Sequence, residues 1–464
     1  MTPKRASLVL FLAAFAGCGG DQAEPAAREA VLASATPAPA ARCDSTGLSS
    51  AALSPSPPCV VAFSDPPPAS GSVDELQPYF DAYSWKTFVA LNWPVRPGTT
   101  EPDAATVIGR ADAPTVWESW KGAWEIFLED GAEPSPWGTT GELPEPCRSA
   151  AAGGQTHVLP FVGKTPNVLT AFDEPFLTGP LIDQAGNYTR YEILVNEPMF
   201  DYIVSNRLYS QEGQIAFARD ADFPSDSANT QPALQGAVMV KAAWRVVDEA
   251  DRARFHVRES LVYTPPSDNP AVEASCESRL MGLVGFHVAH KTVGEPQWLW
   301  STFEHVANAP EAGALPTSGT FNYFDPGCAD CPVNQPPPRP WNPNDEPRPE
   351  NAVQVVRSIP IPPEAKERTD AFHASLRAVN DASVWLNYEL ISTQWPADGD
   401  SPTDPTGDPA PVFLGNTTLE TYIQGRVPNV SSSCILCHNN AADTQGRFSD
   451  FTYLLQLAKG GSRP

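Results

Sequence analysis

The chain carries little positive charge. Its 464 residues include 30 Lys and Arg against 55 Asp and Glu, which gives a net charge of −25 (30 − 55). A nucleic-acid-binding protein needs a basic face to meet the phosphates, so this balance argues against nucleic acid as a partner. It also argues against docking on anionic lipid by charge. An acidic surface favours a basic partner protein instead.

Signatures of several common enzymes are missing. The chain has no nucleophile elbow, P-loop, dinucleotide fingerprint or HExxH motif. No apolar run reaches the roughly 18 residues that a membrane-spanning helix needs. Proline, in contrast, is abundant at 51 residues, about twice its ordinary share. We therefore expect a globular protein with long proline-rich connections.

The N-terminus has the pattern of a secretory signal. Lys4 and Arg5 precede a short apolar run and then small residues. Residues 15–18 (Phe-Ala-Gly-Cys) resemble the bacterial lipobox, whose cysteine is lipid-modified and begins the mature chain. The alternative is an ordinary signal peptide that is cut near Ala16, in which case Cys18 has no special role. We expect a signal peptide over 1–17, a lipid anchor on Cys18, and a location in the cell envelope, on the periplasmic side of a membrane or as an outer-membrane lipoprotein.

Composition divides the mature chain into four parts. An Ala/Pro/Ser-rich stretch over 18–73 is typical of a tether. Residues 74–395 have the patterning of a folded domain, interrupted by a proline-rich loop over 321–350. A Pro- and Asp-rich linker over 396–411 then leads to a C-terminal segment, 412–464.

Hydrophobic periodicity indicates helices on both sides of a strand-rich middle. A helix is predicted over 76–91, and a second from Pro114 whose aromatic stripe should lie in the core. That stripe consists of Trp117, Trp120, Trp124 and Phe127. Further helical patterns occur at 197–208 and 363–379.

The middle of the chain predicts four strands with short connections. Apolar residues alternate over 238–246, and comparable runs follow at 255–263, 280–292 and 297–306. Short connections favour antiparallel pairing. The predicted fold class is therefore α+β, an antiparallel sheet flanked by helices.

Nine cysteines are present, and three are set aside for other chemistry: Cys18, Cys434 and Cys437. The remaining six are an even number in a protein predicted to be exported, where disulfides persist. The plausible bridges are Cys43 with Cys59, Cys147 with Cys276, and Cys328 with Cys331.

The motif C-x-x-C-H, at residues 434–438, is the signature of c-type haem attachment. Two thiols three positions apart can each add to one haem vinyl group, and the adjacent histidine becomes the proximal iron ligand. A zinc site would need a second ligand pair, and none follows. The motif predicts one covalent haem c held by Cys434, Cys437 and His438.

The haem cannot be enclosed by the C-terminal segment alone. Only 26 residues (464 − 438) follow His438, and they contain no Met, His or Cys. Two short helices are too little to surround a haem, so this segment should pack on the larger domain. The sixth iron ligand must then come from upstream, or that position is open.

Three histidines are the main candidates for the distal side: His287, His290 and His305. In a strand, His287 and His290 face opposite sides, so only one of them could reach the haem. Met239 or Met281 could supply the ligand instead. Two alternatives remain: all three histidines are merely hydrogen-bonded, or they form a copper or zinc site.

Residues 84–88 (SWKTF), 298–305 (WLWSTFEH) and the CxxCH motif together resemble bacterial proteins assigned to the cytochrome c family. The resemblance spans most of the mature chain. It implies haem ligation by Cys434, Cys437 and His438 and brings no established reaction.

Two functions follow from these expectations. The first is an exported, lipid-anchored monohaem c-type cytochrome that transfers electrons to or from a redox protein partner. The alternative is a peroxidase- or oxygenase-like haem enzyme with an open distal site in the large domain. The sixth ligand distinguishes the two.

Overall fold

The computed structural model describes most of one compact unit, Ala40–Pro464. The described residues are 51–58, 61, 72–110, 113–151, 156–160, 179–225, 236–264, 266–268, 271–292, 295–328, 330–337, 352–396, 409–424 and 432–461. The predicted signal peptide, the lipid site Cys18 and the predicted Cys43–Cys59 bridge lie outside them. Within the predicted tether, Ala51 and Leu53 pack against the main core.

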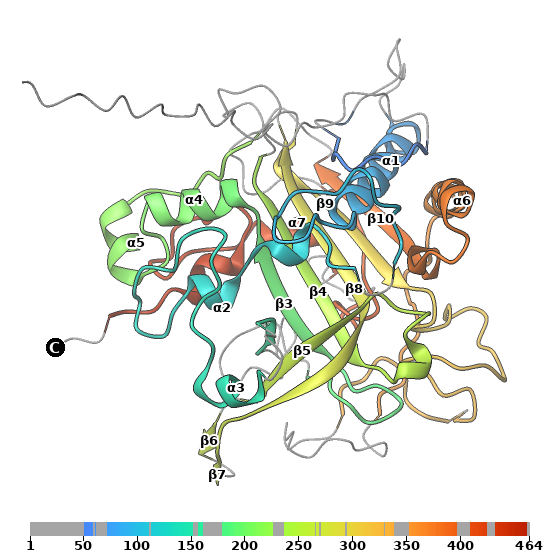
Figure 1. Cartoon of the computed structure of the whole chain (residues 1–464). Coiled ribbons are helices and arrows are strands. Elements are labelled where there is room, and N and C mark those ends of the chain that lie inside the picture. Colours follow the sequence, from blue (N-terminus) through green and yellow to red (C-terminus); the bar gives the residue numbers. More distant parts are fainter. Residues whose placement is uncertain are drawn as a thin grey trace, which may run out of the picture. The chain divides into compact units, whose positions relative to one another are not determined.

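Among the described residues, nine strands form one sheet (Figure 1). Seven lie side by side in this order: β1 (Lys121–Gly122), β3 (Arg190–Val195), β4 (Val238–Val246), β8 (Ser275–Thr292), β9 (Glu295–His305), β10 (Tyr388–Pro396) and β11 (Pro409–Ala410). β5 (Val257–Thr264) pairs with the first half of β8, and β2 (Val158–Leu159) pairs with β5 in parallel. The other pairs in this sheet are antiparallel, so the predicted α+β fold and its four central strands are confirmed. A separate small pair consists of β6 (Ser267–Asp268) and β7 (Ala271–Val272).

The longer helices match their predictions. The helix predicted over 76–91 is α1 (Val73–Leu91), and the one predicted over 363–379 is α6 (Pro363–Val379). The pattern at 197–208 becomes α4 (Glu197–Ser205), which Asn196 caps through its side chain. The shorter helices are α2 (Ala123–Ile126), α3 (Glu145–Ala150), α5 (Gln211–Phe217) and α7 (Cys434–His438), with 3₁₀ turns η1 (Trp117–Ser119), η3 (Glu249–Asp251), η5 (Val384–Asn387) and η7 (Tyr453–Leu457).

The continuous helix predicted from Pro114 is wrong. The chain forms η1, becomes extended at Trp120, pairs through β1 with β3, and only then turns into α2. Pairing with the sheet edge overrides the helical spacing of the aromatic residues. The predicted burial of the stripe largely holds, because Trp117, Trp120 and Phe127 are buried and Trp124 is half-buried.

The sheet has two faces, which β9 defines by alternation. The α1 face carries Leu299, Ser301 and Phe303, which contact Tyr83, Ser84 and Trp85 of α1. The α7 face carries Trp300, Thr302 and Glu304, which contact His438, Asn416 and Thr417. The C-terminal segment therefore covers the face opposite α1, and it packs on the sheet as predicted.

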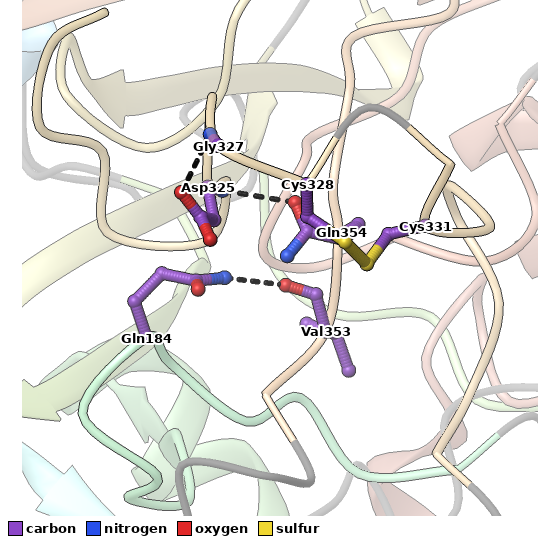
Figure 2. Close-up of a disulfide and its surroundings, with 7 residues drawn as sticks. All are labelled: Gln184, Asp325, Gly327, Cys328, Cys331, Val353 and Gln354. Atoms are coloured by element: carbon purple, nitrogen blue, oxygen red, sulfur yellow. Dashed lines mark hydrogen bonds between the residues drawn. A yellow bond between two sulfur atoms is a disulfide. The ribbon is translucent and has the colours of Figure 1, made fainter.

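Two of the three predicted disulfides are present. Cys147–Cys276 joins α3 to β8 with an S–S distance of 2.05 Å, and Cys328–Cys331 closes a small ring. Figure 2 shows the second bridge in a network of loop contacts, in which the Asp325 amide donates to Gln354 Oε1 at 2.9 Å. In the same network Gln184 donates to the Val353 carbonyl at 2.7 Å.

A buried carboxyl on α1 makes stability depend on pH. Asp81 is fully buried and its Oδ1 accepts hydrogen bonds from Gln77 and from the Thr393 amide and hydroxyl. Burial raises the pKa of Asp81 to about 6, against 3.8 for the exposed group. The folded state therefore holds this proton more tightly, and its stabilising effect is lost as pH rises from 3.8 through 6.

We expect the wild-type free energy of unfolding to fall by about 1–3 kcal/mol across that window. Asp81→Asn keeps the Oδ1 acceptor and has no proton to lose, so this part of the slope should vanish. Urea unfolding of both proteins at several pH values measures the difference. If the free energy of unfolding changes with pH equally in the wild type and in Asp81→Asn, Asp81 is not the group responsible.

Candidate functional site

The CxxCH motif forms α7 itself, and β10 anchors the start of this helix. Ser433 caps it, because its hydroxyl accepts a hydrogen bond from the Leu436 amide at 3.3 Å. Gln394 of β10 accepts a hydrogen bond from the Ile435 amide at 2.8 Å, and the Ile435 side chain is fully buried. The cap and the buried anchor fix the direction of the helix. Cys434 and Cys437 both remain partly exposed.

His438 has one ring nitrogen committed to the backbone. Its Nδ1 lies 2.7 Å from the Phe451 carbonyl oxygen, which can only accept a hydrogen bond. We therefore assign the proton to Nδ1, which leaves the lone pair on Nε2. The ring packs against Trp300 at 4.4 Å and Tyr453 at 5.3 Å between centroids. Metal-binding histidines generally make such a hydrogen bond, because it fixes the ring and raises the basicity of the other nitrogen.

The Phe451 carbonyl is held by an unusual backbone. Asp450 and Phe451 both have positive φ angles, 51° and 60°, in a region that bulky side chains rarely adopt. Asp450 is buried and accepts hydrogen bonds from Lys291 Nζ at 2.7 Å and the Phe223 amide at 2.6 Å. Burial raises the pKa of Asp450, and Lys291 opposes that shift. This buried pair stabilises the strained turn behind His438, and no local sequence signal pointed to it.

Two of the three candidate distal histidines lie on the wrong side of the sheet. His290 is on the α1 face, where its Nδ1 is hydrogen-bonded to the Tyr83 hydroxyl. His305 shares that face, with Nε2 2.9 Å from the Arg254 carbonyl and Nδ1 accepting from the Ala307 amide at 3.1 Å. Burial lowers the pKa of both histidines to about 3. The sheet separates them from α7, so the structure argues against either as ligand to a haem attached there.

The third histidine, His287, lies on the α7 face between Lys241 and Thr302 of the neighbouring strands. Its Nε2 is 3.3 Å from Glu420 Oε2. As the sequence predicted, His287 and His290 face opposite sides of β8.

The methionine candidates also divide between the two faces. Met239 shares the α7 face, and its sulfur lies 3.7 Å from the Thr452 hydroxyl, next to the Phe451 carbonyl. Met281 is buried in the core of the α1 face. His287 and Met239 are thus the two candidates on the correct side of the sheet.

The hypothesis that the three histidines form a copper or zinc site is wrong. Within the part of the chain that the structure describes, which includes all three, no group of three or more His, Cys, Asp or Glu side chains is placed to hold a metal ion. A haem iron is a different case, because the porphyrin supplies four ligands and the protein only the axial ones.

Comparisons with protein-family models, curated proteins and solved structures find no match to this chain. The helices in the described part of the chain include none with the length and apolar character needed to cross a membrane.

Proposed function

We propose that Cys434, Cys437 and His438 bind one haem c, and that the protein is an electron-transfer cytochrome of the cell envelope. One observation carries the proposal: next to two thiols three positions apart, His438 donates its Nδ1 proton to a backbone carbonyl 2.7 Å away. The donor set fits the group, because two thiols suit thioether formation and the Nε2 lone pair suits axial ligation.

The protein's own residues prepare this site. A bound haem c would supply one-electron chemistry. Ser433 and Gln394 fix α7, and therefore the separation and direction of the two thiols. The Phe451 carbonyl orients His438 and makes its imidazole more basic. A rigid axial ligand moves little between oxidation states, and this favours rapid electron exchange.

Exposure favours electron transfer over chemistry in an enclosed pocket. Cys434, Cys437 and His438 are partly exposed, so a group attached there would lie near the protein surface. A partner protein could then approach it closely. With a net charge of −25, a basic partner would be attracted, and the rate would fall as salt increases. Lipid attachment at Cys18 would hold the protein at its membrane.

The test is the visible spectrum of the mature protein, made together with the haem-attachment machinery and recorded ferric, ferrous and with carbon monoxide. We expect a low-spin spectrum that carbon monoxide leaves unchanged, and haem that stays bound through a denaturing gel. A high-spin ferric spectrum with ready carbon monoxide binding would favour the peroxidase- or oxygenase-like alternative. A protein without any haem band would overturn the proposal.

The same spectra identify the sixth ligand. His287→Ala or Met239→Ala should convert the low-spin spectrum to high-spin, according to which side chain binds the iron. His290→Ala is the matched control, because this residue lies on the other face of the sheet.

A further inference from the structure

A second candidate site lies at the β3 side of the sheet, on the α1 face. A cavity of about 320 Å³ is bounded by Glu192 and Leu194 of β3 and by the segment from η1 to α2. On the sheet these two β3 residues pair with Ala242 and Val240, whose side chains belong to the core of the α1 face. The cavity is therefore on the opposite face from α7, and the inference does not rest on the proposed haem.

Each charged side chain on the cavity wall is paired with a side chain of opposite charge. His157 Nε2 lies 2.7 Å from Glu192 Oε2, and Lys121 Nζ lies 3.8 Å from Glu125 Oε1. Because the charges are already paired, an ion entering the cavity would have to compete with an existing partner for every contact. A ligand without net charge avoids that cost and can still accept and donate hydrogen bonds.

A buried carboxylate, Glu118, lies behind the wall of this cavity. Its side chain is 2% exposed, and its Oε2 accepts from the Thr115 amide at 2.7 Å. Its Oε1 lies 3.2 Å from His256 Nε2 and 3.5 Å from Arg258 Nη1, so groups of the protein face both carboxylate oxygens. Burial raises the pKa of Glu118, but His256 and Arg258 outweigh it and lower the pKa to about 2. Glu118 is therefore a negative charge that the protein's own groups already hold, so it adds no uncompensated charge to the cavity wall.

Two indole rings and a set of hydroxyls complete the wall. Trp120 and Trp124 line the cavity, and Trp124 is half-buried. The hydroxyl groups come from Thr99, Thr100, Ser119, Thr139, Thr140 and Thr156. A sugar ring matches both features, since its C–H face packs on an indole while its hydroxyls exchange hydrogen bonds with serine and threonine hydroxyls.

We propose that this cavity binds an uncharged saccharide. Its volume is at the small end of ligand sites, which limits the ligand to one or two sugar rings. Trp124 would contact the ring, and hydroxyl groups of the wall such as that of Thr140 would exchange hydrogen bonds with the sugar.

The test is isothermal titration of the mature protein with glucose, N-acetylglucosamine and maltose, with glutamate as a charged comparison. We expect at least one saccharide to bind with a dissociation constant below about 1 mM, and glutamate not to bind. Trp124→Ala should weaken saccharide binding about tenfold or more. Trp137→Ala is the matched control, because this half-buried tryptophan packs on Phe200 and does not line the cavity.

Thr140→Val provides a second variant, because Thr140 is exposed and its replacement leaves the core intact. If Trp124→Ala does not fold, a loss of affinity in Thr140→Val carries the same conclusion. Three results would overturn the proposal: no saccharide binds up to about 10 mM, glutamate binds and the sugars do not, or the cavity variants bind as tightly as Trp137→Ala.

Discussion

A Cys434→Ala, Cys437→Ala double variant is expected to lose all haem that resists denaturation. Both thioether bonds depend on these thiols, and no other pair of cysteines has an adjacent histidine. Each single variant retains one thioether bond and should keep a reduced amount. Haem staining of a denaturing gel, together with intact mass, measures the outcome.

The chain contains its own control for this experiment. Cys328 and Cys331 have the same spacing but form a disulfide and are followed by proline. A Cys328→Ala, Cys331→Ala variant should therefore stain like the wild type. Equal loss in both double variants would mean that any disturbance of the fold prevents haem attachment, and full staining of the Cys434/Cys437 variant would contradict covalent binding there.

Arg357→Met is expected to lower the free energy of unfolding by roughly 3–5 kcal/mol. Arg357 donates from Nη1 and Nη2 to the two oxygens of Glu304, at 3.2 and 3.0 Å, and both side chains are buried. The arginine also lies 3.8 Å from Glu389. Without it, Glu304 would keep a buried charge whose remaining hydrogen bonds, among the described residues, come from the amide and hydroxyl of Thr417.

Denaturant unfolding of the wild type and variant measures this loss. Arg252→Met is the comparison, because Arg252 pairs with Glu249 at the surface and such pairs contribute about 1 kcal/mol or less. Similar losses in the two variants would show that burial does not strengthen the Glu304–Arg357 pair. Since Glu304 also binds Thr417, the variant should loosen the segment that precedes α7 as well.

Local sequence patterns predicted a helix or strand correctly where the pattern of burial within that single element determines its structure. Alternation in 238–246 predicted β4, and helical spacing predicted α1 and α6, because each pattern reports which side of a single element is buried. The same reasoning failed after Pro114. There the helical spacing was real, but β1 gains hydrogen bonds from β3, a strand about 70 residues later, and no local pattern contains that partner.

The sequence by itself determined the chemistry proposed for the site, since the spacing of Cys434, Cys437 and His438 is local. It also determined that His287 and His290 face opposite ways, because strand geometry requires it. Only the tertiary structure decided which face α7 covers, and with it which histidine remains a candidate.

The hydrogen bond that orients His438 also depends on the tertiary structure. The Phe451 carbonyl depends on a turn that Asp450 and Lys291, 159 residues apart, hold together. Hydrophobic periodicity shows which side of one element is buried and which is exposed. The contacts of Asp450 with Lys291 and of Phe451 with His438 form only when elements that are distant in the chain pack on one sheet.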